Sequence, residues 1–179
     1  MIKKKLLIVV NESWFFVSHR LSLALYAQQN GYDVHIAANG DRKSVLKIES
    51  SGLKFHSVPF TRSSTKIVNE ISTLWSLIKL YNYVRPDIVH HVTIKPIVYG
   101  GIASRVVSVP LVVNAISGLG FVFISTGVVS TIRKSIVSFF YKIMFNRKNV
   151  RVIFQNPDER NLLLKNNIVS SKYSYLIKG

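Results

Sequence analysis

The chain has 179 residues, of which 48% are hydrophobic and none is cysteine. This length suits one well-buried domain, and the lack of cysteine excludes disulfides and thiolate metal sites. The 24 basic and 8 acidic residues give a formal net charge of +16, and no Asp or Glu lies between Asp87 and Asp158. Such a charge favours an anionic partner: nucleic acid, anionic lipid or a phosphorylated substrate.

Apolar runs of strand length alternate with stretches of helical periodicity along the whole chain. The predicted strands are residues 6–10, 34–38, 53–58, 88–92, 111–116 and 152–155. The predicted helices are residues 18–30, 42–50, 66–83, 96–107, 128–145 and 157–166, and a last apolar stretch covers 173–177. This order predicts an α/β fold for residues 1–179, a single Rossmann-like domain with helices on both faces of a doubly wound parallel sheet.

Residues 106–132 carry no charge and are long enough to cross a bilayer, so a transmembrane helix competes with the globular interpretation. Proline, asparagine and glycine residues divide this segment, which favours a strand, a glycine-rich loop and the start of a helix. The apolar run at 6–10 is too short for a secretion signal and predicts a first strand.

The segment after the first strand has no Gly-x-Gly-x-x-Gly fingerprint, which argues against a nicotinamide or flavin enzyme, and the chain has no P-loop. Trp14 and Phe15 stand there instead and suit a platform for a sugar or an isoprenoid chain. We expect His19 and Arg20 at the opening of the first helix, where anions are favoured, with His19 as a general base. The alternative is that the aromatic residues cover the sheet edge and His19 caps the helix.

Polar and glycine-rich segments follow the fourth and fifth predicted strands. In an open α/β sheet, ligands bind outside the carboxyl ends of the strands, so function should be sought there. The candidate residues at this edge are His91, Thr93, Lys95, Gly118 and Gly120. His90 and His91 point to opposite faces of a strand, so joint metal binding is not expected.

The predicted helix at 128–145 has a broad apolar surface beside basic residues. A basic, aromatic amphipathic helix can lie in an anionic membrane interface, with Arg133, Lys134 and Lys142 facing the membrane. The alternative is that the apolar face packs on the sheet, and both interpretations can hold together.

Several motifs spread over nearly the whole chain resemble the amino-terminal domain of family 4 glycosyltransferases. The most similar branch assembles bacterial surface polysaccharides such as O-antigen or capsule. The motifs are Trp14-Phe15-Phe16 with His19-Arg20-Leu21, Gly31-Tyr32-Asp33-Val34, Thr93-Ile94-Lys95-Pro96 with Tyr99-Gly100, Ser117-Gly118-Leu119-Gly120 with Phe123, and Val152-Ile153-Phe154-Gln155-Asn156.

The resemblance implies a GT-B architecture, in which two Rossmann-like domains face each other across a cleft. The first handles the acceptor and the second the nucleotide-sugar donor, and no cofactor or metal is expected. This chain resembles only the first domain and lacks the donor-binding carboxylate pair, so we expect it to be inactive without a donor-binding half. Three arrangements remain open: a subunit of a split transferase, a fragment of a longer transferase, or a stand-alone protein that binds a lipid-linked saccharide.

The expected partners are a lipid-diphosphate-linked saccharide acceptor, an anionic membrane surface and a separate donor-binding chain. By position, the acceptor would contact Trp14, Phe15, Arg20 and the residues of the carboxyl edge. The protein is expected in the cytoplasm, bound peripherally to the inner face of the cell membrane. A nucleic-acid-binding module is the weaker alternative, motivated by a sequence pI of about 10.3. Many aromatic residues lie in strands or apolar helix faces, and no nucleic-acid motif occurs, so nucleic acid is not the expected partner.

Overall fold

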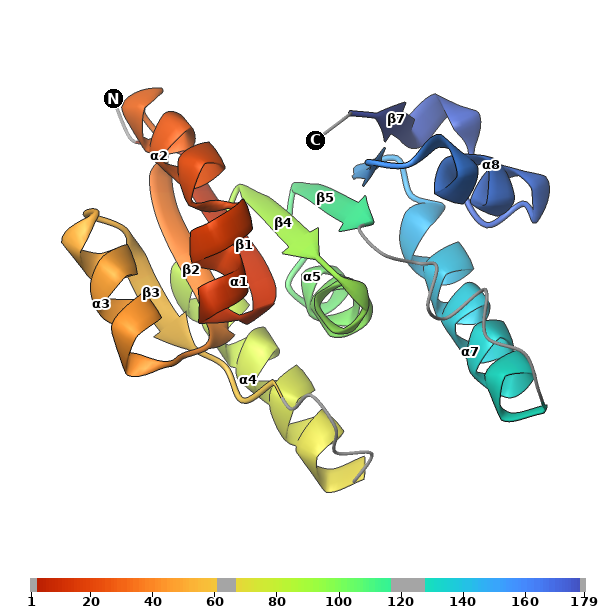
Figure 1. The fold of residues 1–179 in the computed structure, drawn as a ribbon, viewed down its shortest axis with the longest axis horizontal. Helices are drawn as coiled ribbons and strands as arrows, with labels where there is room; N and C mark the ends of the chain where they lie inside the picture. The colour runs from red at the N-terminus through yellow and green to blue at the C-terminus, as the bar shows by residue number, and fades with distance from the viewer. Residues whose placement is uncertain (1–2, 61–66, 117–127, 178–179) are drawn as a thin grey trace.

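A computed structural model of the protein describes residues 3–60, 67–116 and 128–177. Within these ranges the strands form one parallel sheet in the order β3-β2-β1-β4-β5-β6-β7, which runs from left to right in Figure 1. The strands are β1 (Lys5–Glu12), β2 (Asp33–Asn39), β3 (Lys54–Ser57), β4 (Ile88–Val92), β5 (Leu111–Ile116), β6 (Val150–Phe154) and β7 (Ser174–Leu176).

Helices cover both faces of this sheet. They are α1 (Ser13–His19), α2 (Leu21–Gln29), α3 (Arg42–Ser50), α4 (Ile67–Val84), the π-helix η1 (Pro96–Gly100), α5 (Gly101–Val106), α7 (Val128–Phe145), α8 (Pro157–Lys165) and the 3-10 helix η2 (Ser171–Tyr173). One buried cluster joins the sheet to α4, α5 and α7, and a second joins its other face to α1, α2 and α3. The predicted Rossmann-like, doubly wound α/β fold is therefore confirmed.

The predicted helix at 18–30 is wrong in its start and its continuity. The helix α1 begins at Ser13, directly after β1, and Arg20 interrupts the helical path with φ −130° and ψ −7° before α2 starts. The reason is that Ser13 and Phe16, three residues apart, are both buried on one face of a helix, while Trp14 between them is exposed. His19 consequently lies in the last turn of α1, where the helix dipole favours cations, and not at a helix N-terminus.

The side chain of His91 lies in the core and connects three elements. Its Nδ1 is 2.8 Å from Oδ1 of Asn114 on β5, and its Nε2 is 2.8 Å from the hydroxyl of Tyr81 on α4. Because an amide oxygen can only accept, His91 donates from Nδ1 and accepts the Tyr81 hydroxyl proton at Nε2. These two bonds hold the ring as one neutral tautomer between the sheet and α4.

Gly100, at the end of the π-helix η1, lies directly against this hydrogen-bonded group. A Cβ atom at position 100 would be 2.6 Å from Cδ2 of His91 and 2.8 Å from the hydroxyl oxygen of Tyr81. Both contacts are closer than real Cβ atoms approach. The η1 backbone can therefore pass over His91 only because residue 100 has no side chain.

Both histidines of β4 are buried and neutral at physiological pH. Burial, together with the positive charge of Arg20 and the neighbouring His91, lowers the pKa of His90 to about 3. Burial lowers the pKa of His91 to about 4, and the hydrogen bond with Asn114 opposes this shift. The unfolded chain binds protons on these residues near pH 6.5, so protonation favours unfolding at acid pH.

Gly100→Ala should lower the free energy of unfolding by about 1–3 kcal/mol, because the added methyl group overpacks the His91 region. Gly101→Ala is the matched control: its Cβ would meet Sδ of Met144 at 2.6 Å, and that flexible side chain can move. Chemical denaturation followed by circular dichroism measures both. Equal losses for the two variants would contradict the close-approach argument.

Stability should be greatest above about pH 6.5 and fall as the pH drops toward 4, by about 1 kcal/mol per pH unit for each buried histidine. In this range the unfolded state gains protons that the native state excludes. His91→Gln removes one of these titrations, so its unfolding free energy should fall less steeply with pH, whatever its value at pH 8. An identical slope in the variant would show that His91 titrates normally in the native protein.

Candidate functional site

Within the described residues, five buried polar atoms without hydrogen-bond partners belong to the strands β1, β4 and β5 or to the segments that follow β1 and β4. These atoms are Oδ1 of Asn11, Nε of Arg20, Nε2 of His90, Oγ1 of Thr93 and Nδ2 of Asn114. Leaving one such group unpaired costs about 1–3 kcal/mol, so native proteins rarely gather them without a ligand or water to satisfy them. We name these five residues the polar cluster.

The register of the sheet explains why the cluster forms. Val9 of β1 pairs with His91 of β4, and His91 pairs with Asn114 of β5. Asn11 and Thr93 each lie two residues further along their strands, just beyond the paired region. The parallel pairing of β1 and β4 therefore brings Asn11 and Thr93, which are distant in sequence, to the same edge of the sheet.

The cluster extends to both faces of β4. His91 contacts Tyr81 of α4, whereas His90 pairs in register with Ile8, which belongs to the buried cluster of α1, α2 and α3. The two adjacent histidines therefore point to opposite faces, as the alternation along a strand predicts. Within the described part of the chain, no three His, Asp or Glu side chains gather as a metal site would require.

Thr93 has a strained backbone at this edge. Its φ is +76°, which is a genuine outlier for a β-branched residue and costs on the order of 1–3 kcal/mol. Its carbonyl accepts the N–H of Ile97 at 3.1 Å, at the entry to the π-helix η1. Strained residues and π-helical turns both concentrate at functional sites, so the turn from β4 into η1 supports the location of the site.

Arg20 supplies the positive charge of the cluster. It is half-buried at the junction of α1 and α2, and desolvation lowers its pKa. Its Nη1 donates to the carbonyl of His19 at 3.3 Å, its Nε has no partner, and no carboxylate of the described residues forms an ion pair with it. A partly desolvated guanidinium of this kind is suited to a phosphate or carboxylate ligand.

The charge of Lys95, in contrast, is offset inside the protein. Its Nζ is 2.6 Å from Oε1 of Glu70 on α4. Burial raises the pKa of the Tyr99 hydroxyl, and the Glu70 carboxylate adds to this shift. The predicted contact of Lys95 with the acceptor stays a prediction, because Lys95 would have to share its charge with Glu70.

The remaining predicted residues lie in different places. His91 is fully buried and both ring nitrogens are bonded, so it supports the site from within the core and we assign it no ligand contact. His19 is exposed; its ring stacks on Phe15 with centroids 4.4 Å apart, and its Nδ1 is 2.7 Å from the Ser18 hydroxyl. Trp14 is 46% exposed on the same helix.

Gly118, Gly120 and the side chain of Arg133 lie outside the described residues. Lys134 is half-buried and Lys142 is exposed on α7. The sequence interpretation assigned no role to Asn11, His90 or Asn114. The available signal was a polar residue at or near the end of an apolar strand, as in the segments 6–11 and 111–116.

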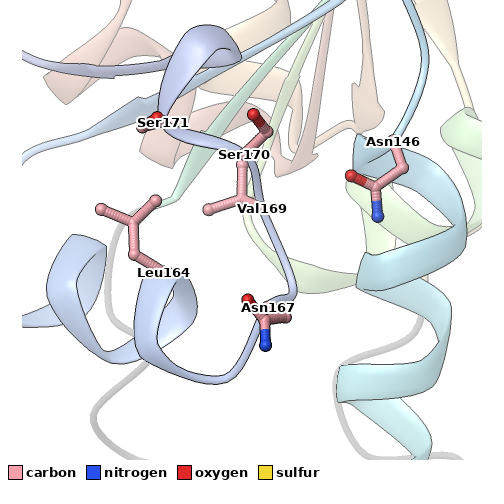
Figure 2. Close-up of a pocket in the computed structure, with 6 residues that line it drawn as sticks. All are labelled: Asn146, Leu164, Asn167, Val169, Ser170 and Ser171. Carbon is pink, nitrogen blue, oxygen red and sulfur yellow. The ribbon is translucent and has the colours of Figure 1, made fainter.

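Two pockets lie at the amino edge of the sheet, away from the polar cluster. Figure 2 shows the first, of about 420 Å³, between the end of α7 and the turn after α8. Its lining residues are Asn146, Leu164, Asn167, Val169, Ser170 and Ser171. The second, of about 380 Å³, lies between the turns that precede β4 and β5. Neither is at the edge where ligands bind in open α/β sheets.

No helix in the part of the chain that the structure describes combines the length and the hydropathy needed to cross a membrane. Of the uncharged segment 106–132, the described residues include the last residue of α5, the strand β5 and the first turn of α7.

Comparison with solved structures finds the same fold in several proteins. A glycosyltransferase from Rickettsia africae matches with a TM-score of 0.71 at 15% identity, over 99% of this chain and 43% of that protein. MurG from Acinetobacter baumannii matches with a TM-score of 0.58 at 15% identity, over 98% and 45%. UDP-GlcNAc 2-epimerase from Methanocaldococcus jannaschii matches with a TM-score of 0.63 at 14% identity, over 98% and 45%.

The chain thus spans less than half the length of each of these proteins. Comparison with curated protein sequences gives no significant match. A sequence model of the family described as "Glycosyl transferase 4-like" matches residues 5–156, which include every strand from β1 to β6 and the whole polar cluster. The chain therefore belongs to the glycosyl transferase 4-like family, and its fold is that of one Rossmann-like domain of a GT-B glycosyltransferase.

Proposed function

We propose that this domain binds the acceptor in a glycosyl transfer reaction, and that the polar cluster holds the diphosphate and first sugar of a lipid-linked acceptor. The observation that carries the proposal is Arg20, a half-buried guanidinium near His90 that has no carboxylate partner among the residues the structure describes. An anionic ligand would satisfy both the charge and the hydrogen-bonding capacity of this arginine.

The other members of the cluster suit a sugar. Thr93 Oγ1 can donate and accept, Asn114 Nδ2 donates, and Asn11 Oδ1 accepts. Sugar hydroxyls likewise donate and accept, so they are suited to bond with these side chains. The strained Thr93 holds its hydroxyl at this edge at the expense of backbone energy.

His19 is proposed as the general base for the acceptor hydroxyl. It precedes Arg20, and its ring is exposed at the end of α1, stacked on Phe15. Imidazole is suited to proton transfer near neutral pH, and the stacking limits its orientation.

The nucleotide-sugar donor would be bound by a second, donor-binding half. Because the fold is shared by a UDP-GlcNAc 2-epimerase, the fold alone does not distinguish transfer from epimerisation, and the family match supports transfer. The motif set described for the sequence supports a reaction of surface polysaccharide assembly on lipid-linked intermediates. Without the donor half, the domain would bind its acceptor and not turn it over.

The helix α7 is proposed as the membrane contact. Its residues Tyr141, Met144 and Phe145 are buried against the sheet, while Ile136 and Phe139 are exposed near the exposed Lys142. The helix therefore has enough apolar surface both to pack on the sheet and to present apolar and basic side chains outward, which supports peripheral binding to an anionic bilayer.

Arg20→Ala should weaken binding of inorganic pyrophosphate, and of a lipid diphosphate, by about 10–100-fold at 150 mM salt, since charged hydrogen bonds contribute about 1.5–3 kcal/mol. Titration calorimetry measures both affinities.

Arg85→Ala is the control: it removes the same charge at the opposite edge of the sheet and should have little effect on either affinity. His19→Ala should also leave affinity unchanged, but lower turnover when a donor-binding half is supplied. Pyrophosphate affinity that is unchanged in the Arg20 variant would refute the proposed site.

Reversing the charges of Arg133, Lys134 and Lys142 to Glu should release the protein from anionic vesicles, because basic residues near an anionic surface contribute about 1 kcal/mol each. Cosedimentation with vesicles measures the bound fraction. The same reversal at Lys3, Lys4 and Lys165, three exposed lysines elsewhere, changes net charge equally and should have a smaller effect. Equal release by both triple variants would mean that net charge, not α7, determines binding.

A further inference from the structure

An open groove lies between α1 and α3, on the first of the two helices that flank Arg20. Its volume is about 850 Å³ and its exposed surface is mostly apolar. Trp14 and Val17 of α1 and Leu46 of α3 supply this apolar surface. Trp14 is 46% and Leu46 is 58% exposed, so part of the apolar surface of the groove is accessible to solvent.

The rim of the groove is basic. Lys43 and Lys47 lie one turn apart on α3 and both line it. Asp41 is the acidic residue of the lining, but its carboxylate accepts the Ser13 hydroxyl at 2.7 Å and the N–H of Ser44 at 2.9 Å. The hydrogen bonds from Ser44 and Ser13 lower the pKa of Asp41 to about 2. The carboxylate therefore stays ionised and bonded at the start of α3, and the two lysines leave the groove lining with a net positive charge.

The same bonds hold the two walls of the groove in place. Besides accepting the Ser13 hydroxyl proton, Asp41 donates its own N–H to Ser13 Oγ at 2.9 Å. Ser13 is fully buried at the start of α1, and Asp41 caps α3. The groove is therefore formed between two helices that are linked at their N-terminal ends.

Aromatic rings connect the groove to the polar cluster along α1. The rings of Trp14 and Phe15 meet edge to face with centroids 6.1 Å apart, and Phe15 stacks on His19. Arg20 follows directly. The helical rise from Trp14 to Arg20 is only ~9 Å, which is within the length of a short isoprenoid diphosphate.

We propose that the groove between α1 and α3 binds the hydrocarbon chain of the same anionic lipid whose diphosphate the polar cluster binds. This inference rests on the proposed function and names the lipid subsite of that site. The apolar surface of the groove suits the chain, Arg20 suits the diphosphate, and the rings of Phe15 and His19 lie on α1 between the two. Lys43 and Lys47 add positive charge that favours an anionic lipid. The groove is at the end of the sheet opposite α7, so chain binding and bilayer contact can be tested separately (Figure 1).

A series of diphosphates with increasing chain length tests the proposal: inorganic pyrophosphate, isopentenyl diphosphate and farnesyl diphosphate, each below its micelle concentration. The chain has two tryptophans, and Trp75→Phe leaves Trp14 as the only one. We expect farnesyl diphosphate to bind at least tenfold more tightly than isopentenyl diphosphate and to shift Trp14 emission to shorter wavelength. Pyrophosphate should bind without this shift.

Leu46→Glu should lower the affinity for farnesyl diphosphate at least tenfold and leave that for pyrophosphate unchanged. Leu23→Glu is the matched control, because Leu23 is similarly exposed, at 45%, on α2 and away from the groove. It should change neither affinity. If the Leu46 variant is poorly folded, the Trp14 emission of the Trp75→Phe protein still tests the proposal, because that protein keeps Leu46.

Equal affinities for isopentenyl and farnesyl diphosphate, or an unchanged Trp14 emission, would overturn the groove proposal while leaving the diphosphate site standing. A Trp14 shift of the same size with phosphatidylglycerol vesicles free of diphosphate lipid would also overturn it, because the groove would then bind bilayer lipid. Pyrophosphate binding that does not depend on Arg20 would instead overturn the proposed function itself.

Discussion

The hydrogen bonds of His91 determine how the centre of this domain is assembled. The ring joins β4 to β5 through Asn114 and to α4 through Tyr81, and all three partners are buried. The π-helix η1 can pass over this group because residue 100 is glycine. The turn from β4 into η1, which includes the strained Thr93, is thus built on a neutral histidine held in one tautomer. A ligand site needs such a rigid support if its polar groups are to stay in place.

Hydrogen bonding distinguishes the buried polar residues that stabilise the core from those that are candidates for binding a ligand. His91 uses both ring nitrogens within the core, whereas His90, on the opposite face of the same strand, leaves Nε2 unpaired. The side chain of Asn114 has one paired and one unpaired polar atom: its oxygen accepts from His91, while its Nδ2 has no partner among the described residues. Unpaired buried groups lower stability, and several of them in and after the central strands are expected where a ligand restores the missing bonds.

The short helix α1 combines two kinds of ligand chemistry. Its first turn carries Trp14 on an apolar groove, and its last turn ends at Arg20 in the polar cluster. Phe16, buried between them, anchors the helix to the sheet. A single rigid element can therefore set the distance between an apolar subsite and an anionic one. This arrangement agrees with an amphiphilic acceptor in the proposed reaction.

The sequence by itself determined the fold class, because the alternation of apolar strands and periodic helices depends on local composition and spacing, and each strand but the last was predicted within a few residues. It also indicated the carboxyl edge, through Thr93 and the segments around it. It did not determine that Trp14 to His19 are helical, since a run of aromatic residues is equally compatible with a loop until Phe16 packs on the sheet. Only the tertiary structure decided which polar side chains are paired. Lys95 pairs with Glu70, and His91 bonds to Tyr81 and Asn114, while Nε of Arg20 and Nε2 of His90 have no hydrogen-bond partner among the described residues. The sequence could not show this, because hydrogen bonding and desolvation depend on contacts between residues distant in sequence.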